Sequence, residues 1–236
     1  MWRSMKAFLL AAGIGSRLRP LTDATPKCLI PVAGKPLIEW WLELFRLHGV
    51  TDVLINTHHH REQVRDFIDG HNANRGQPKL YETYEQRLMG SGGTVLTNRD
   101  FVAEEREFLI CYADNLTRIN LTALRDFHRG HNGVLTMALS PSNTPEQAGI
   151  VSLDENGLIV EFVEKPVRPK SDLANAGVYI ANQAVFSHFP RQEFIDFAAD
   201  VLQGLAGQMY GRIVEEYHLD IGTPENLQKA RDEWLT

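Results

Sequence analysis

The stretch KAFLLAAGIGSRLRPLT, residues 6–22, decides the fold expected for this chain. Its first part, Lys6–Ala11, is typical of a short buried strand. The strand runs directly into a loop that contains Gly13 and Gly15. Glycine lets the backbone turn tightly and bring its N–H groups close to an anion. The stretch therefore predicts a strand followed by a phosphate-binding loop, which favours a nucleotide site.

Three cations accompany these glycines, namely Arg17, Arg19 and Lys27. In one loop they would repel one another unless an anion binds among them. A dinucleotide-binding loop needs a third glycine where this chain has Leu18, and a P-loop ends in Gly-Lys-Ser/Thr, so neither of these motifs fits. A plain turn after the first strand is the alternative for the glycine pair alone. The added positive charge favours a triphosphate site.

The composition is that of a soluble globular protein. The chain has 236 residues, of which 43% are hydrophobic and 23% charged, with a net charge of −6. This balance disfavours a nucleic-acid groove or an anionic membrane as partner, and no apolar run reaches the roughly 20 residues that span a bilayer. Residues 1–4 are too short and polar for a secretory signal, so we expect a cytoplasmic protein. Cys28 and Cys111 imply neither a disulfide framework nor a zinc cluster, and we expect both to be reduced and partly buried.

The order of strand and helix patterns predicts an α/β fold in one domain, residues 1–236. The nucleotide-binding half extends to about residue 140. Its strands are expected at 6–11, 52–57, 79–82, 107–112 and 134–139. Its helices are expected at 37–48, at 61–69, after Gly93 and at 121–130. From about 141 to 236, the closing half, an Asn-Gly turn at 156–157 predicts an antiparallel hairpin of 149–153 with 158–164. Further strands are expected at 175–180 and 209–220, and helices at 195–203 and 224–235.

Two aspartates lie where strands end. Asp114 follows the apolar run 108–113, and Asp220 ends the run His218-Leu219-Asp220. Ligands of α/β proteins collect at the carboxyl ends of strands, and Mg²⁺ prefers one or two carboxylates together with substrate oxygens. The pair therefore predicts a metal–phosphate site. Taken alone, Asp114 would more simply cap the turn that follows it.

Two further segments carry chemistry. In residues 84–94, Glu85 precedes a run of glycines at Gly90, Gly92 and Gly93, which suits a flat base lying on backbone, with Glu85 accepting hydrogen bonds from donors such as those of guanine. A capped, glycine-rich helix start is the alternative. Glu164 and Lys165 end a strand and suit a sugar phosphate, although such a pair is usually a solvated ion pair. Gly149 and Asn175 suit the approach of a sugar ring, whereas the neighbouring His58, His59 and His60 cannot readily converge on one metal ion.

Taken in order, these motifs resemble the sugar-1-phosphate nucleotidylyltransferases over nearly the whole chain. The motifs are residues 11–22, 25–27, 89–93, 113–114, 164–166, 175–177 and 220–225. The chain is most similar to short bacterial members such as the mannose-1-phosphate and manno-heptose-1-phosphate guanylyltransferases and the N-acetylmuramate-1-phosphate uridylyltransferase. The resemblance implies a three-layer, Rossmann-like fold with a mixed, mostly parallel central sheet and an antiparallel sugar-binding extension. It also implies a nucleoside triphosphate and a sugar 1-phosphate as substrates, and a homodimer as a family-level expectation.

The resemblance further implies roles for individual residues. The residues implied to act on the nucleotide are Ala11, Gly13, Gly15, Arg17, Lys27, Glu85 and Gly90, with Arg17 and Lys27 as the catalytic cations. The residues implied to bind the sugar phosphate are Gly149, Glu164, Lys165 and Asn175, and the Mg²⁺ ligands are Asp114 and Asp220. Two other functions stay open at this point: a phosphocholine cytidylyltransferase, which residues 112–115 also resemble, and a non-catalytic regulatory paralogue that binds nucleotide sugars.

Overall fold

The computed structural model describes residues 5–235 and divides into two compact units. The first comprises Met1–Leu88, Cys111–Ile119 and Glu216–Thr236, and the second comprises Met89–Ile110 and Asn120–Glu215. Residues 1–4, on which the expectation about a signal sequence rests, lie outside the described part. Within that part, no helix combines the length and apolar character that a membrane span requires.

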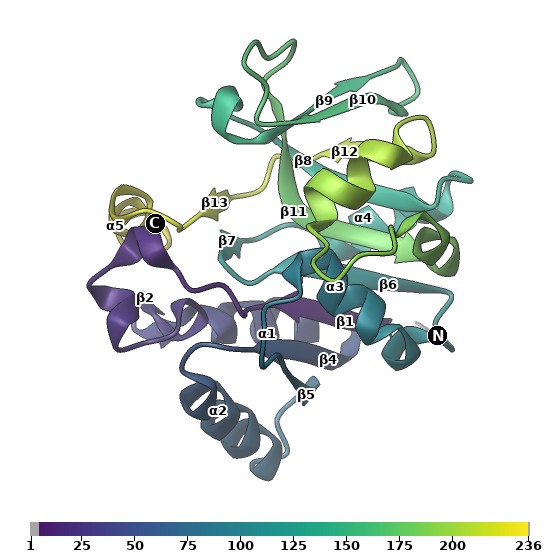
Figure 1. The fold of residues 1–236 in the computed structure, drawn as a ribbon. Coiled ribbons are helices and arrows are strands. Elements are labelled where there is room, and N and C mark those ends of the chain that lie inside the picture. The colour runs from purple at the N-terminus through teal and green to yellow at the C-terminus, as the bar shows by residue number, and fades with distance from the viewer. Residues whose placement is uncertain (1–4, 236) are drawn as a thin grey trace. The chain divides into compact units, whose positions relative to one another are not determined.

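The first unit is built on parallel strands that begin with the predicted one. β1 (Met5–Leu10) pairs with β4 (Val50–Thr57), and β4 pairs with β5 (Lys79–Tyr84), all in parallel. The crossovers between them are α1 (Leu37–Leu47) and α2 (Arg61–Ala73) (Figure 1). Short elements complete the unit: β2 (Pro31–Val32), β3 (Lys35–Pro36), β7 (Asn115–Thr117), β13 (His218–Asp220) and α5 (Pro224–Glu233). The predicted α/β fold is confirmed.

One hydrophobic cluster of this unit ties the glycine loop to the C-terminal helix. Leu18, which lies within the loop, is 1% exposed and belongs to a cluster with Leu116 of β7, Ile221 and Trp234. Figure 1 shows α5 (yellow) beside β2 (purple), and the Arg231 guanidinium donates to the Pro31 carbonyl oxygen. Because one core holds segments from both ends of the chain, it fixes the backbone that carries the candidate site.

The second unit combines parallel and antiparallel strands. β8 (Leu135–Pro141) pairs antiparallel with β11 (Leu173–Asn182) and parallel with β12 (Met209–Ile213). The predicted hairpin is formed by β9 (Gly149–Leu153) and β10 (Ile159–Glu164), and β9 also pairs with β11. The helices are α3 (Gly90–Thr97) and α4 (Leu121–Arg129), while β6 (Glu107–Tyr112) begins in this unit and ends in the first. The mixed strand pairing and the antiparallel extension are therefore confirmed.

Two helix predictions are corrected, and both corrections have one cause. α3 begins at Gly90 rather than after Gly93, and residues 195–203 form a π turn at Phe197–Val201 and a 3₁₀ turn at Leu202–Leu205 instead of one α-helix. The backbone of Ile195 is already used: its N–H donates to the Met89 carbonyl, and its carbonyl accepts from the N–H groups of Gly92 and Gly93. The Ile195 carbonyl thus bonds to α3, and the Ala199 N–H, which would bond to it in an α-helix, donates to the Asp196 side chain instead.

The two cysteines are more buried than expected. Cys28 and Cys111 are free thiols with 2% and 0% exposure, respectively. Burial raises the pKa of the Cys28 thiol to about 12, and that of Cys111 well above its ordinary value. Neither thiol is therefore suited to act as a nucleophile.

A buried histidine pair lies between α4 and β8. His128 Nδ1 and His131 Nε2 lie 2.9 and 2.7 Å from the Thr136 hydroxyl, and the Gly133 N–H donates to His131 Nδ1. Since His131 Nδ1 accepts, its Nε2 carries the proton and donates to Thr136, whose hydroxyl donates in turn to His128 Nδ1. Both rings are therefore held neutral, and burial, reinforced by His131, lowers the pKa of His128 to about 4.

We predict that the protein loses stability in mild acid because of His128. The unfolded chain takes up a proton at this ring near pH 6.5, the folded chain only near pH 4, so the stabilisation is complete above pH 6.5 and is lost as the pH falls toward 4. His128 is only 6% exposed, and the loss amounts to roughly 3 kcal/mol. Urea unfolding at several pH values in this range gives the free energy of unfolding as a function of pH. This free energy should fall less steeply with decreasing pH for His128→Asn, which keeps an acceptor for Thr136, than for the wild type. Equal slopes in the two proteins would contradict the prediction.

Candidate active site

The glycine loop is held at its far end by a buried threonine. Gly15 has a φ of 69°, and the Thr22 hydroxyl donates to its carbonyl oxygen over 2.8 Å. A Cβ at Gly15 would approach Thr22 Cγ2 to 2.8 Å, whereas a Cβ at Gly13 would meet nothing within 4 Å. Glycine is thus required at position 15 by both conformation and space, and Gly13 faces open room in which a ligand would fit.

The two predicted aspartates of the first unit come together through strand pairing. β7 and β13 are antiparallel, with Asp220 opposite Asn115, and the Ile221 N–H donates to the Asp114 carbonyl over 3.0 Å. The Lys27 ammonium lies 2.8 Å from Asp114 Oδ2 and 3.6 Å from Asp220 Oδ1. Segments far apart in the sequence therefore place two carboxylates around one cation.

Lys27 itself is buried, and its side chain is 9% exposed against 39% and 49% for those of Asp114 and Asp220. A buried ammonium is costly unless it is paired, so the two carboxylates compensate it. Burial raises the pKa of Asp220, and the neighbouring Asp114 carboxylate raises it further, whereas Lys27, Arg17 and the Gly222 N–H act in the opposite direction. The two carboxylates are close enough to repel each other, which creates a local demand for positive charge.

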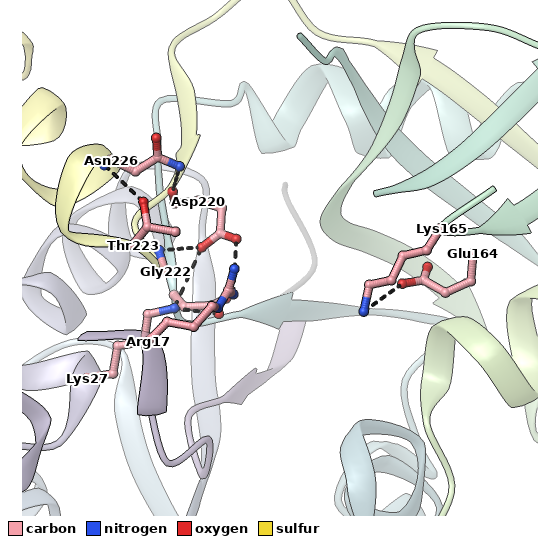
Figure 2. Close-up of polar contacts among 9 residues, drawn as sticks. Arg17, Lys27, Glu164, Lys165, Asp220, Gly222, Thr223 and Asn226 are labelled. Atoms are coloured by element: carbon pink, nitrogen blue, oxygen red, sulfur yellow. Dashed lines mark hydrogen bonds and ion pairs between the residues drawn. The ribbon is translucent and has the colours of Figure 1, made fainter. Parts of the chain in front are cut away.

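Figure 2 shows how the residues around Asp220 converge. The Gly222 N–H donates to Asp220 Oδ1 over 2.7 Å, and Arg17 Nη2 lies 3.9 Å from Oδ2. A Cβ at Gly222 would come within 2.7 Å of the Arg17 guanidinium and 2.8 Å of Asp220 Oδ1. Asn226 donates to the Asp220 carbonyl, and Thr223 caps α5 by accepting from the Asn226 N–H. The turn is thus shaped around the contact of Arg17 with Asp220.

The cations of the loop are paired with carboxylates of the protein, whereas the sequence predicts that they require a bound anion. Arg17 and Lys27 face the carboxylates of Asp114 and Asp220, and Arg19 forms an exposed ion pair with Asp23 over 3.2 Å. The argument that these charges need a bound anion was therefore wrong, because the protein's own carboxylates compensate them. The contact of Arg17 with Asp220 is a weak one, since the Arg17 side chain is 63% exposed and the distance is 3.9 Å.

Glu85, predicted to read a base, is 2% exposed and accepts from the Asn56 amide over 2.7 Å. The glycines that follow, Gly90, Gly92 and Gly93, lie against other parts of the chain. A Cβ at Gly90 would come within 2.3 Å of the Ile195 carbonyl oxygen, and Gly90 has a φ of 79°. Gly90, Gly92 and Gly93 therefore permit close backbone packing within the second unit, and base recognition by Glu85 and Gly90 stays a prediction.

The residues predicted to bind a sugar phosphate lie at the end of the hairpin in the second unit. Gly149 pairs with Glu164, and a Cβ at Gly149 would approach Glu164 Oε2 to 2.7 Å and the Phe162 ring to 2.7 Å. Lys165 has a φ of 48°, and its exposed ammonium lies 3.8 Å from Glu164 Oε1 (Figure 2). Asn175 lies on β11 one residue from Ala174, which pairs with Ile150 of β9. The structure thus brings all four residues to one region of this unit.

Glu164 is the more perturbed member of this group. Burial raises the pKa of its carboxyl, Lys165 opposes this shift, and Asp196 adds to it. The ionised Glu164 carboxylate can accept hydrogen bonds from hydroxyl groups beside its contact with Lys165. Asp196, which also caps the following turn through the Ala199 N–H, is a neighbour that the sequence analysis did not identify.

The fit to a metal ion is decided by the donor set. Within residues 5–235, no group of three or more His, Cys, Asp or Glu side chains is arranged to hold a metal. Asp114 and Asp220 alone offer two carboxylates that share one cation, which suits Mg²⁺ when water or phosphate oxygens complete its shell. The neighbouring histidines, which we did not expect to converge on one ion, have other contacts: His58 Nδ1 lies against the Glu85 carbonyl, and the rings of His59 and His60 lie 3.8 Å apart and tilted by 50°.

The comparison with known protein families is decisive. The family model described as "Nucleotidyl transferase" matches residues 6–236. The chain belongs to the nucleotidyl transferase family. This result confirms that the chain resembles the sugar nucleotidyltransferases, several of which are among its relatives.

Relatives of this nucleotidyl transferase come from archaea, bacteria and the eukaryote Dictyostelium discoideum. The low-salt glycan biosynthesis nucleotidyltransferase Agl11 of Haloferax volcanii is 31% identical, over 96% of this chain and 65% of the relative. A D-glycero-α-D-manno-heptose 1-phosphate guanylyltransferase of Aneurinibacillus thermoaerophilus is 29% identical, over 97% and 98%. A Bacillus anthracis structure assigned as a glucose-1-phosphate thymidylyltransferase and solved with sucrose has a TM-score of 0.87 at 25% identity, over 97% and 94% of the two chains. The chain spans 53–65% of the length of Agl11 and of three more curated relatives, one of which is a mannose-1-phosphate guanylyltransferase subunit of Dictyostelium discoideum.

Sequence reasoning missed Asn56, which contacts the start of the glycine loop. The signal was present: Asn56 is the first polar residue after the apolar run Val53–Ile55, at the carboxyl end of the strand that follows the loop in sequence. Thr22 and Gly222 lie within the motifs 11–22 and 220–225, but the sequence alone indicates no role for either residue. Their roles depend on contacts with Gly15 and Arg17 that only the folded chain provides.

We predict that Gly149→Ala disrupts the hairpin end of the second unit. The added methyl group would meet the Glu164 carboxylate and the Phe162 ring, and overpacking of this kind costs about 1–3 kcal/mol. Gly204→Ala is the matched control, because a Cβ there meets nothing within 4 Å. Denaturant unfolding should show a loss for the first variant and little change for the second. Equal stabilities would mean that Glu164 and Phe162 move aside at no cost.

Proposed function

We propose that this nucleotidyl transferase moves a nucleotidyl group from a nucleoside triphosphate to a sugar 1-phosphate, giving a nucleoside diphosphate sugar and pyrophosphate. The observation that carries the proposal is the contact of Lys27 with both Asp114 and Asp220 beside the glycine loop. Two carboxylates and a buried cation at a phosphate-type loop suit the joining of two polyanions better than they suit hydrolysis by a nucleophilic side chain. The names of the relatives support the same reaction class.

We favour GTP as the donor, and mannose 1-phosphate or a manno-heptose 1-phosphate as the acceptor. Of the relatives compared above, the heptose-1-phosphate guanylyltransferase is matched over nearly its whole length. Two further relatives are mannose-1-phosphate guanylyltransferases. The bonded pair of Asn56 and Glu85 at the carboxyl ends of β4 and β5 agrees with a base that donates hydrogen bonds, as guanine does through its ring N–H and amino group.

In the proposed reaction, a phosphate oxygen of the sugar 1-phosphate attacks the α-phosphorus in line. A new P–O bond forms as the bond to the pyrophosphate oxygen breaks, and no covalent intermediate with the protein is needed. The main obstacle is repulsion between two polyanions. Holding them in near-attack geometry can lower the barrier by roughly 7–11 kcal/mol in favourable cases.

The chain's own residues would share this work. The loop N–H groups around Gly13 and Gly15 would bind the triphosphate, and Arg17 would turn from Asp220 toward it, since that contact is exposed and long. Lys27 would stabilise charge on the transferring phosphoryl group. In the second unit, Lys165 would bind the sugar phosphate, and Glu164 with Asn175 would accept hydrogen bonds from sugar hydroxyls.

Asp114 and Asp220 would hold a divalent cation, with Mg²⁺ as the best match to their donor chemistry. When bound, the ion would supply charge neutralisation and orientation for the phosphates. The raised pKa of Asp220 agrees with this assignment, because a cation relieves the same repulsion from Asp114.

Removing Asp114 tests the metal and phosphate roles. Asp114→Asn keeps the shape but removes the charge that faces Lys27, so we expect pyrophosphate release to fall by roughly a hundredfold or more. The melting temperature should change far less, because Asp220 still compensates Lys27 and the repulsion between the two carboxylates is relieved. Asp69→Asn, an exposed residue of α2, is the control and should retain full turnover. Near-normal turnover of Asp114→Asn would refute the role.

The substrate pair is tested by measuring pyrophosphate release with the four common ribonucleoside triphosphates, each offered with a panel of sugar 1-phosphates and with phosphocholine. We expect the highest kcat/KM with GTP and a manno-configured sugar phosphate. Turnover only with CTP and phosphocholine would replace the proposal with the cytidylyltransferase alternative. Binding of a nucleotide sugar without any turnover would indicate the regulatory paralogue.

A further inference from the structure

Asn56, the penultimate residue of β4, holds the start of the glycine loop. Its Oδ1 accepts from the Ala11 N–H over 2.6 Å and from the Ala12 N–H over 3.3 Å. These are the first two residues after β1, and Asn56 is only 5% exposed. One buried side-chain oxygen therefore fixes the direction in which the chain leaves the strand and enters the loop.

The orientation of this amide is determined by its contacts. Because Oδ1 accepts from two backbone N–H groups, Nδ2 must face the other way, where it donates to Glu85 Oε1 over 2.7 Å. The backbone of Glu85 is fixed as well, since its N–H donates to the Thr57 carbonyl and its carbonyl contacts His58 Nδ1. A chain of hydrogen bonds thus runs from the Glu85 carboxylate through Asn56 to the loop.

The loop is consequently anchored at both ends. Asn56 holds its entry at Ala11, and Thr22 holds its exit at Gly15. Between the anchors lies Gly13, with free space around its Cα. A loop that is rigid at its ends and open in the middle presents preorganised N–H groups to an anion, which reduces the entropy lost on binding.

We propose that Asn56 is a positioning residue that sets the triphosphate-binding geometry of the loop and couples it to Glu85, the residue predicted to read the base. The inference rests on the proposed function and deepens it. Asn56 acts through the backbone of Ala11 and Ala12 and not by touching the substrate itself. Its loss should therefore weaken phosphate binding whatever base is attached.

The first test compares two asparagines of the same unit. Asn72 makes a similar bridge to backbone, since its Oδ1 accepts from the Leu80 N–H and its Nδ2 donates to the Leu80 carbonyl. We expect Asn56→Ala to weaken the binding of inorganic triphosphate and of GTP, measured by calorimetry with Mg²⁺ present, by roughly tenfold or more. Asn72→Ala should lower the melting temperature but leave both affinities unchanged.

The second test keeps the shape of the side chain and changes its charge. Asn56→Asp places a carboxylate against that of Glu85, and two such groups share a proton, so one of them acquires a raised pKa. Binding of inorganic triphosphate by this variant should be strongest at low pH and should weaken as the pH rises and both groups ionise. The double variant Asn56→Asp/Glu85→Gln exchanges the amide and the carboxylate, and it should restore the pH dependence of the wild type, which reflects only protonation of the triphosphate.

The outcomes separate this inference from the proposed function. If the wild type binds inorganic triphosphate and GTP but Asn56→Ala binds both with unchanged affinity, Asn56 is only structural and the inference fails alone. Should Asn56→Ala not fold, the additional pH dependence of Asn56→Asp and its reversal in the double variant decide the question, and a profile for Asn56→Asp equal to that of the wild type would overturn the inference. Failure of the wild type to bind either ligand would refute the proposed function, and the inference with it.

Discussion

The contact of a buried lysine with two aspartates is the interaction on which the rest of the candidate site depends. Lys27 is buried because its segment belongs to the core that contains Leu18 and Ile30, so its charge must be compensated nearby. The pairing of β7 with β13 brings Asp114 and Asp220 to it. The two carboxylates repel each other, and the cations Lys27 and Arg17 offset this repulsion. Lys27 and the two aspartates thus depend on one another for charge compensation.

The same interaction links stability to chemistry. An ammonium that offsets two carboxylates is already placed where negative charge gathers, and a divalent cation would compete for the same oxygens. The loop beside it is fixed by side chains that have no charge, Thr22 at Gly15 and Asn56 at Ala11. The glycine loop is therefore anchored by neutral hydrogen bonds, and the charged groups beside it face one another.

Much of the fold could be predicted from the sequence, because strong local patterns agree with the tertiary structure. The apolar run before Gly13, the Asn-Gly turn at 156–157 and the proline at the start of α5 each specify their element without help from distant residues. Residues 195–203 were mispredicted because a pattern that suits a helix was overridden: the backbone of Ile195 is bonded to α3. Cations in a loop indicated a site, yet sequence alone could not show that Asp114 and Asp220 compensate them. Asn56 was missed for a similar reason, since its partners Ala11 and Glu85 lie far from it along the chain.

The first unit is discontinuous, and this has a consequence for biosynthesis. Its glycine loop and Lys27 leave the ribosome early, Asp114 follows after part of the second unit, and Asp220 emerges only with the final segment, Glu216–Thr236. A nascent chain can therefore fold β1, β4 and β5 long before β13 exists to pair with β7. During that interval Lys27 has one of its two carboxylate partners and the hydrophobic cluster lacks Ile221 and Trp234. The centre proposed to handle nucleotides is thus completed only once Glu216–Thr236 has been made, so a nascent chain that lacks this segment does not present both carboxylates to metal and triphosphate.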